Sequence, residues 1–233
     1  MRMFKFLILP FILLNFAGQV YAAADSAYDL NVNVQSFQLG NGMLFLVVER
    51  PATPQVAIRL AIRAGSALEG TGKTGIAHLL EHMLFKGTKN FGSLDYKKDQ
   101  ELQTRIEAAY QVVLEEQSKR QPDTTVINKK VAEMETLRRE VQKIYVSKAF
   151  SAQLGKNGAV GVNAFTTKDQ TQYMASVPAD MLEQWFAIAS EQIFEPAWRE
   201  FYVEKEVVQR EWAFRYINDP GGAAGLDLST TAY

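Results

Sequence analysis

The chain has 233 residues, of which 47% are hydrophobic and 22% charged, and its formal net charge is -1. This composition is typical of a soluble globular protein with a full-sized core. Because basic residues are not in excess, the chain lacks the positive field that nucleic-acid binding requires, so nucleic acid is excluded as an expected partner. The absence of cysteine excludes disulfides and cysteine-ligated metals, so any transition metal must be held by histidine and carboxylate.

The first residues have the order of a secretory signal peptide. Arg2 and Lys5 give a basic start, residues 6–14 form an apolar run, and small residues around Ala22 offer a cleavage site. The apolar run is far shorter than the roughly 20 residues that span a bilayer. We therefore expect a bacterial signal peptide over residues 1–22, a mature protein that is secreted or periplasmic, and no stable membrane anchor after cleavage. An uncleaved membrane anchor is the alternative.

The next part of the chain predicts strands followed by a helix. Alternating apolar residues predict strands at 34–39 and 43–48, joined by a turn at Gly40-Asn41-Gly42, and a further strand at 56–64. A Gly-rich turn then leads into a helix from about Thr74 to Phe85.

A different pattern follows, with apolar residues at spacings of three and four among charged ones. A break at 121–123 divides this pattern, and Asp123 is placed to cap the second helix. We predict an inserted antiparallel helical hairpin at about 95–147, whose two apolar stripes pack together; a solvated charged linker is the alternative. Because such a hairpin can pack on itself, we expect most of it to be dispensable for the metal site described below. The predicted stripes are Leu102, Ile106, Ala109 and Val113, then Ile127, Val131, Met134, Val141 and Ile144.

Strands and helices alternate again after the hairpin. Strands are predicted within 161–177, and amphipathic helices at 178–195 and 197–216. A turn is predicted at 218–222, with the start of another helix after it. Together these elements predict an α+β fold over residues 25–233, in which a mainly antiparallel sheet has helices packed on one face and carries the helical hairpin.

The only two histidines of the chain, His78 and His82, lie four residues apart in the sequence H-L-L-E-H, with Glu81 between them. On a helix, residues i, i+3 and i+4 share one face, so the three side chains project into one volume. Two imidazoles on adjacent turns suit a tetrahedral zinc with one position open for water, and a neighbouring carboxylate can take that water's proton. The spacing predicts a zinc site with Glu81 as the catalytic base; two unrelated neighbouring histidines are the alternative.

The third ligand must be a carboxylate, because no other histidine and no cysteine is present. The helix predicted at 197–216 offers Glu200, Glu204, Glu206 and Glu211. Glu204 and Glu211 are seven residues apart and therefore share one face, so either could reach a metal. Spacing alone does not choose between them.

Three separated stretches resemble one family of enzymes. Residues 75–88, G-I-A-H-L-L-E-H-M-L-F-K-G-T, resemble the zinc helix of the insulinase/pitrilysin metallopeptidases. Asn163-Ala164-Phe165-Thr166 resembles that family's substrate-edge strand, and residues 204–211, E-K-E-V-V-Q-R-E, resemble its third-ligand helix. The joint match, which extends over roughly residues 34–228 apart from the hairpin, is far more specific than H-x-x-E-H alone. The unusually long chain between the first and third stretches is explained by the predicted insertion.

The resemblance implies a zinc metalloendopeptidase that hydrolyses peptides or unfolded protein segments. It implies that His78, His82 and Glu211 hold one Zn2+ per chain and that Glu204 supports the site from nearby. It also implies that the edge strand at Asn163-Ala164 binds an extended substrate by β-augmentation.

The same resemblance implies a second domain or a partner chain that completes the cleft, because the family builds it from at least two related domains. On this interpretation the chain is an N-terminal catalytic domain that is incomplete at its C-terminus. A zinc-binding but inactive fragment and a non-catalytic partner subunit are the alternatives, and a zinc hydrolase of non-peptide substrates is a further one.

Overall fold

The computed structural model describes residues 32–232, which divide into one unit ending at Ala52 and a second that begins at Thr53. The signal peptide expected over residues 1–22 lies outside the described residues. Within residues 32–232, none of the helices is both long and apolar enough to cross a membrane.

The first unit contains a β-hairpin. Strand β1 (Val34–Gln38) pairs antiparallel with β2 (Leu44–Val48), and the rings of Phe37 and Phe45 stack across the pair with centroids 4.8 Å apart. The connection turns at Gly42, whose φ of 89° is readily adopted only by glycine. The hairpin predicted around Gly40-Asn41-Gly42 is therefore present.

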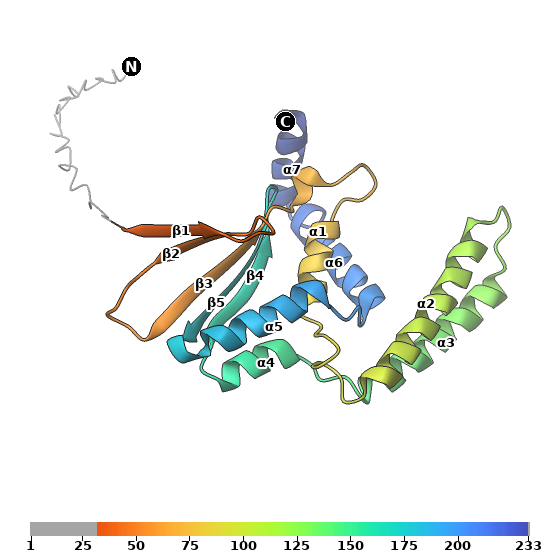
Figure 1. The fold of residues 1–233 in the computed structure, drawn as a ribbon. Helices are drawn as coiled ribbons and strands as arrows, with labels where there is room; N and C mark the ends of the chain where they lie inside the picture. The colour runs from red at the N-terminus through yellow and green to blue at the C-terminus, as the bar shows by residue number, and fades with distance from the viewer. Residues whose placement is uncertain (1–31, 233) are drawn as a thin grey trace, which may run out of the picture. The chain divides into compact units, whose positions relative to one another are not determined.

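The second unit contains a three-stranded antiparallel sheet (Figure 1). Strand β5 (Thr171–Pro178) lies in the middle, between β3 (Gln55–Ile62) and β4 (Val160–Thr166). Burial alternates along β3, which indicates that one face of the sheet is covered and the other exposed. Strand β4 forms one edge of this sheet, which positions it for the site below.

Helices α4 (Ala149–Lys156) and α5 (Leu182–Phe194) cover one face of that sheet (Figure 1). A single-turn helix at Ala179–Met181 leads into α5. The predicted α+β fold, with an antiparallel sheet and helices on one face, is confirmed. The buried cluster between the helices and the sheet comprises Phe150, Leu154, Ala175, Val177, Trp185 and Ala189.

The predicted metal helix is α1 (Ile76–Leu84), which lies against β4, β5 and α6 (Phe201–Tyr216). A single-turn helix at Ser66–Leu68 precedes it. The carboxylate of Glu69 closes the start of α1, accepting the backbone N–H groups of Gly75 and Ala77 at 2.7 Å each. A negative charge at a helix N-terminus is favourable, so this contact fixes where α1 begins.

The helical hairpin is also present, with α2 (Tyr96–Ser118) and α3 (Thr124–Gln142) side by side. As predicted, Asp123 caps α3, its carboxylate accepting the N–H of Thr125 at 2.8 Å. Val131, however, is 43% exposed, so its place in the predicted stripe is wrong. The buried face of α3 contains Met134, Leu137 and Val141. At the same helical spacing, the next residue toward the N-terminus on this face is at position 130, and not Val131. The buried cluster of the hairpin comprises Leu102, Ile106, Ala109, Met134, Leu137 and Val141.

Two predicted boundaries near the C-terminus are wrong. Helix α6 begins at Phe201 instead of Ala197, because Glu200 has a left-handed φ of 56° and Ala197 donates its N–H to the carbonyl of Gly87. The predicted turn at 218–222 is instead the start of α7 (Pro220–Ala232). Proline suits the first position of a helix, and the Asp219 carboxylate accepts the N–H of Gly222 at 2.8 Å as a cap. Helix α4 was not predicted.

The hairpin contacts the rest of the domain through its base. Asp99 pairs with Arg199, Gln142 donates to Glu200, and the ring of Tyr110 stacks on Tyr202. These contacts lie outside residues 112–131, the outer part of the hairpin. We therefore expect this outer part, and not most of the hairpin, to be dispensable for the metal site.

We expect replacement of residues 112–131 by a short Gly/Ser linker to leave folding and metal content unchanged, because the buried cluster of the hairpin remains intact. Circular dichroism and elemental analysis would measure both. The matched comparison is replacement of residues 95–147, which removes Asp99 and the other contacts at the base of the hairpin and should destabilise the domain. Loss of folding in the shorter replacement would show that the outer hairpin belongs to the core.

Candidate metal centre

The side chains of His78, His82 and Glu211 converge between α1 and α6. One ligand atom from each lies within 4.8 Å of the others. Nε2 of His78 is 3.6 Å from Glu211 Oε2, and Nε2 of His82 is 4.0 Å from Glu211 Oε1. All three side chains are partly exposed, so the cluster opens to solvent on one side.

These three groups fit a zinc ion. In a tetrahedral site with metal–ligand distances of roughly 2.0–2.1 Å, ligand atoms are separated by about 3.3 Å. The separations at Glu211 are close to this value, and small side-chain rotations would reach it. Burial lowers the pKa of His78, which favours the neutral imidazole that binds a metal. Two imidazoles and one carboxylate also leave a fourth position for water.

Glu204 supports His82 from the side away from the cluster. His82 Nδ1 lies 2.9 Å from Glu204 Oε2, so this nitrogen donates and Nε2 keeps its lone pair for a metal. The hydrogen bond raises the pKa of His82 and lowers that of Glu204 to about 2. Lys86 also pairs with Glu204 Oε1 at 2.6 Å, so both oxygens of this carboxylate already have partners. The geometry thus favours Glu211 as the ligand and Glu204 as the supporting carboxylate.

Glu81 lies on the same face of α1 as the two histidines and is only 8% exposed. Its Oε2 accepts a hydrogen bond from Thr166 Oγ1 at 2.6 Å. Thr166 is the last residue of β4, so the edge strand contacts the predicted catalytic base directly. A carboxylate held beside an open metal position is placed to accept a proton from water.

The two residues predicted to bind substrate, Asn163 and Ala164, lie in the middle of β4. They are opposite Met174 and Tyr173 of β5. Asn163 is exposed and Ala164 is half-buried, as expected for an edge strand with one covered face. The structure therefore brings β4 beside α1, the helix that carries the two histidines.

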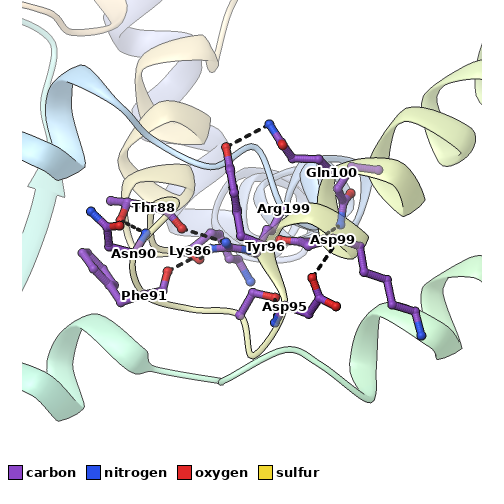
Figure 2. A network of polar contacts seen from close by, with 12 residues as sticks. Lys86, Thr88, Asn90, Phe91, Asp95, Tyr96, Asp99, Gln100 and Arg199 are labelled. Atoms are coloured by element: carbon purple, nitrogen blue, oxygen red, sulfur yellow. Dashed lines mark hydrogen bonds and ion pairs between the residues drawn. The ribbon is translucent and has the colours of Figure 1, made fainter.

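A buried arginine joins the end of α1 to the start of α6 (Figure 2). Arg199 is 1% exposed and pairs with Asp99, which is 2% exposed. Its other nitrogens donate to the carbonyls of Lys86, Thr88 and Phe91, at 3.0, 2.7 and 3.1 Å. These bonds fix the turn that follows α1 against the residues that precede α6.

Glycines make room for this guanidinium. Gly87 and Gly92 both have a φ of 96°, and a Cβ at either position would come within 2.9 or 2.6 Å of Arg199 Nη1. Any larger residue would therefore combine backbone strain with a steric clash. Because α1 carries the histidines and α6 carries Glu211, the arginine connects the two segments that bring the candidate ligands together.

Sequence reasoning missed several of these supporting residues. Thr166 and Lys86 stand inside the recognised stretches, but nothing in their spacing indicates which carboxylate each one contacts. The sequence around Arg199 does not indicate its partners, because they are 100 to 113 residues away in the chain. The local signal that could have indicated a buried ion pair is the position of two charged residues between two aromatic ones, in W-R-E-F at 198–201.

Comparisons with known proteins identify the family and support the fold. The family model described as insulinase, peptidase family M16, matches residues 44–110 and 142–216. The unmatched residues between these stretches comprise the end of α2, the turn after it and most of α3. A crystal structure of a protease from Helicobacter pylori superposes with a TM-score of 0.55 at 23% identity, covering 82% of this chain and 33% of that one, which supports the fold.

Relatives with similar sequences are described as zinc proteases or processing peptidases. An uncharacterized zinc protease of Rickettsia bellii is 49% identical over 59 residues, which are 25% of this chain and 14% of that protein. The probable zinc protease PqqL of Haemophilus influenzae is 43% identical over 60 residues, 25% of this chain and 6% of that protein. The mitochondrial-processing peptidase subunit beta of Rattus norvegicus is 38% identical over 85 residues, 35% of this chain and 17% of that protein.

The matched stretches thus span only a small part of these longer relatives. The family model, by contrast, matches more than half of this chain, on both sides of the helical hairpin. The resemblance inferred from the three sequence stretches is confirmed, and the chain belongs to the insulinase family, peptidase family M16.

Proposed function

We propose that this chain is the catalytic N-terminal domain of a zinc-dependent endopeptidase that hydrolyses peptides or unfolded protein segments. The observation that carries the proposal is the convergence of His78, His82 and Glu211, from two helices far apart in the chain, beside the buried carboxylate of Glu81. The zinc proteases among its relatives support the same chemistry.

Each residue of the site has a distinct part in this chemistry. His78, His82 and Glu211 would hold one zinc ion, which lowers the pKa of a bound water. Glu81 would accept a proton from the attacking water and pass it to the leaving amine. Glu204 keeps His82 in the tautomer that presents Nε2.

The substrate is proposed to bind along the edge of the sheet. Strand β4 pairs with β5 on one side, and its other side is an edge of that sheet. An extended peptide can add to such an edge through backbone hydrogen bonds, next to Asn163 and Ala164. This mode favours unfolded or flexible substrates, because a folded protein does not present an extended backbone.

The proposal includes a second domain or a partner chain that completes the cleft, and a secreted or periplasmic location. Holding a peptide against the metal from several sides supplies much of a peptidase's rate. The second domain or partner chain is supported by the relatives, which are several times longer than the stretches they share with this chain. One of these relatives is itself described as a subunit. The location rests on the signal peptide expected over residues 1–22.

We expect Glu81→Gln to retain zinc and lose chelator-sensitive cleavage of a quenched fluorescent peptide, on the order of 100-fold or more, because an amide cannot accept the water's proton. Zinc content by elemental analysis and turnover with and without a chelator measure the two effects. Unchanged turnover in this variant would remove Glu81 from the mechanism.

Glu101→Gln is a matched control, because this exposed carboxylate lies on α2 away from the site. It should retain both zinc and turnover. If the wild-type chain binds zinc but shows no chelator-sensitive cleavage, alone or with a supplied partner domain, the alternative of a zinc-binding, non-catalytic chain replaces the proposal.

A further inference from the structure

Glu81 is held by a hydroxyl from the substrate-edge strand. Thr166 Oγ1 donates to Glu81 Oε2 at 2.6 Å, a short distance typical of a hydroxyl bonded to a charged carboxylate. Within residues 32–232, no other side chain donates a hydrogen bond to Glu81. The orientation of this buried carboxylate therefore depends on one hydroxyl.

A second hydroxyl lies behind that of Thr166. Thr171 is its partner across the β4–β5 pair, and the two Oγ1 atoms are 3.1 Å apart. Thr171 Oγ1 also lies 2.8 Å from the carbonyl oxygen of Ala64, which can only accept. The single hydrogen of Thr171 is thus taken by Ala64, and the hydrogen of Thr166 is free to point at Glu81.

We propose that Thr166 is a positioning residue for the catalytic base, which holds Oε2 of Glu81 so that Oε1 faces the water. The inference rests on the proposed function, since it gives Glu81 its role as base. A base must lie within hydrogen-bond reach of the proton it removes, and a misplacement of about 1 Å can cost on the order of 100-fold in rate. Because Thr166 also ends the edge strand, the segment that would bind the peptide is the one that orients the base.

The decisive pair of variants is Thr166→Val and Thr166→Ser. Valine has the shape of threonine and suits a strand but lacks the hydroxyl, whereas serine retains it. Thr167→Val is the matched control, because its hydroxyl serves only the turn between β4 and β5 and does not contact Glu81. Zinc content is expected to be the same in all three.

The probe is acetohydroxamic acid bound to the zinc-loaded chain, since its hydroxyl can bond to a correctly oriented carboxylate. We expect Thr166→Val to weaken its affinity about tenfold, the effect of losing one hydrogen bond to a charged group, and Thr166→Ser to stay within about twofold. Where cleavage is measurable, kcat should fall on the order of 10- to 100-fold in the valine variant with KM unchanged.

The outcomes separate this inference from the proposed function. If Glu81→Gln weakens hydroxamate binding but Thr166→Val does not, the inference is overturned and the proposed function stands. If Glu81→Gln changes neither hydroxamate binding nor cleavage, the proposed function itself fails. Equal losses in Thr166→Val and Thr167→Val would assign the effect to the turn and overturn the inference.

A second variant keeps the inference testable if Thr166→Val does not fold. Thr171→Val leaves Thr166 in place but removes the hydroxyl behind it. Because Thr171 gives its hydrogen to Ala64, its oxygen can only compete with Glu81 as an acceptor for the Thr166 hydrogen, so hydroxamate affinity should stay within about twofold of wild type. A loss of about tenfold in Thr171→Val, in which the Thr166 hydroxyl is intact, would overturn the inference.

Discussion

Replacing His82 by alanine is expected to remove stoichiometric zinc from the protein. The wild-type chain should hold about one zinc, as a site with two imidazoles and one carboxylate does. His82 contributes the Nε2 that faces Glu211, and its ring is fixed through Nδ1 by Glu204. Without it, one histidine and one partly exposed carboxylate remain, which do not retain zinc through dialysis. Elemental analysis of the dialysed variant is the measurement, and unchanged zinc would refute the site.

The same experiment separates the two glutamates of α6. Glu211→Gln should weaken zinc binding more than Glu204→Gln, because it removes a ligand, whereas loss of a supporting hydrogen bond typically costs about 10- to 100-fold in affinity. Glu206→Gln is the control, since this exposed residue lies on the same helix and has no contact with His82. A larger loss at Glu204 than at Glu211 would exchange their roles.

A residue of this site can be predicted from the sequence where its position depends on neighbouring residues, and not where it depends on the packing of distant segments. His78, Glu81 and His82 are set by the period of one helix, so their shared face could be predicted. Glu204 and Glu211 also share a face, and the choice between them needed the tilt of α6 against α1. The structure supplies that tilt by placing Glu204 on Nδ1 of His82 and Glu211 near the Nε2 atoms.

The same distinction explains which elements of the fold could be predicted from the sequence. The β1–β2 hairpin, the strands and the Asp123 cap follow from neighbouring residues and were predicted. The start of α6 was not, because residues 196–197 pair with residues 87–88 instead of continuing a helix. Tertiary contacts override helical propensity there, since the N–H of Ala197 finds a carbonyl outside its own segment.

The largest expected effect on stability comes from Arg199. Replacing it by methionine leaves the buried carboxylate of Asp99 without a partner and frees three carbonyls in the turn after α1. Breaking a buried ion pair in this way costs about 3–5 kcal/mol. We expect Arg199→Met to lower the free energy of unfolding of the zinc-free protein by this amount, measured by urea denaturation, and to weaken zinc binding because α1 and α6 lose their fixed spacing.

Two further variants test the cause of that loss. Arg139→Met should change stability by less than about 0.5 kcal/mol, because Arg139 is an exposed residue of α3 that donates to Thr136 of the same helix. The double variant Arg199→Met with Asp99→Leu removes both charges and should recover part of the stability, since a buried pair replaced by apolar side chains is often tolerated. The recovery should be incomplete, because the carbonyls of Lys86, Thr88 and Phe91 still lack their donor. Full stability in Arg199→Met alone would refute the expected contribution of this ion pair. Unchanged zinc binding would mean that α1 and α6 are held together by the pairing of Lys86 with Glu200 and Glu204.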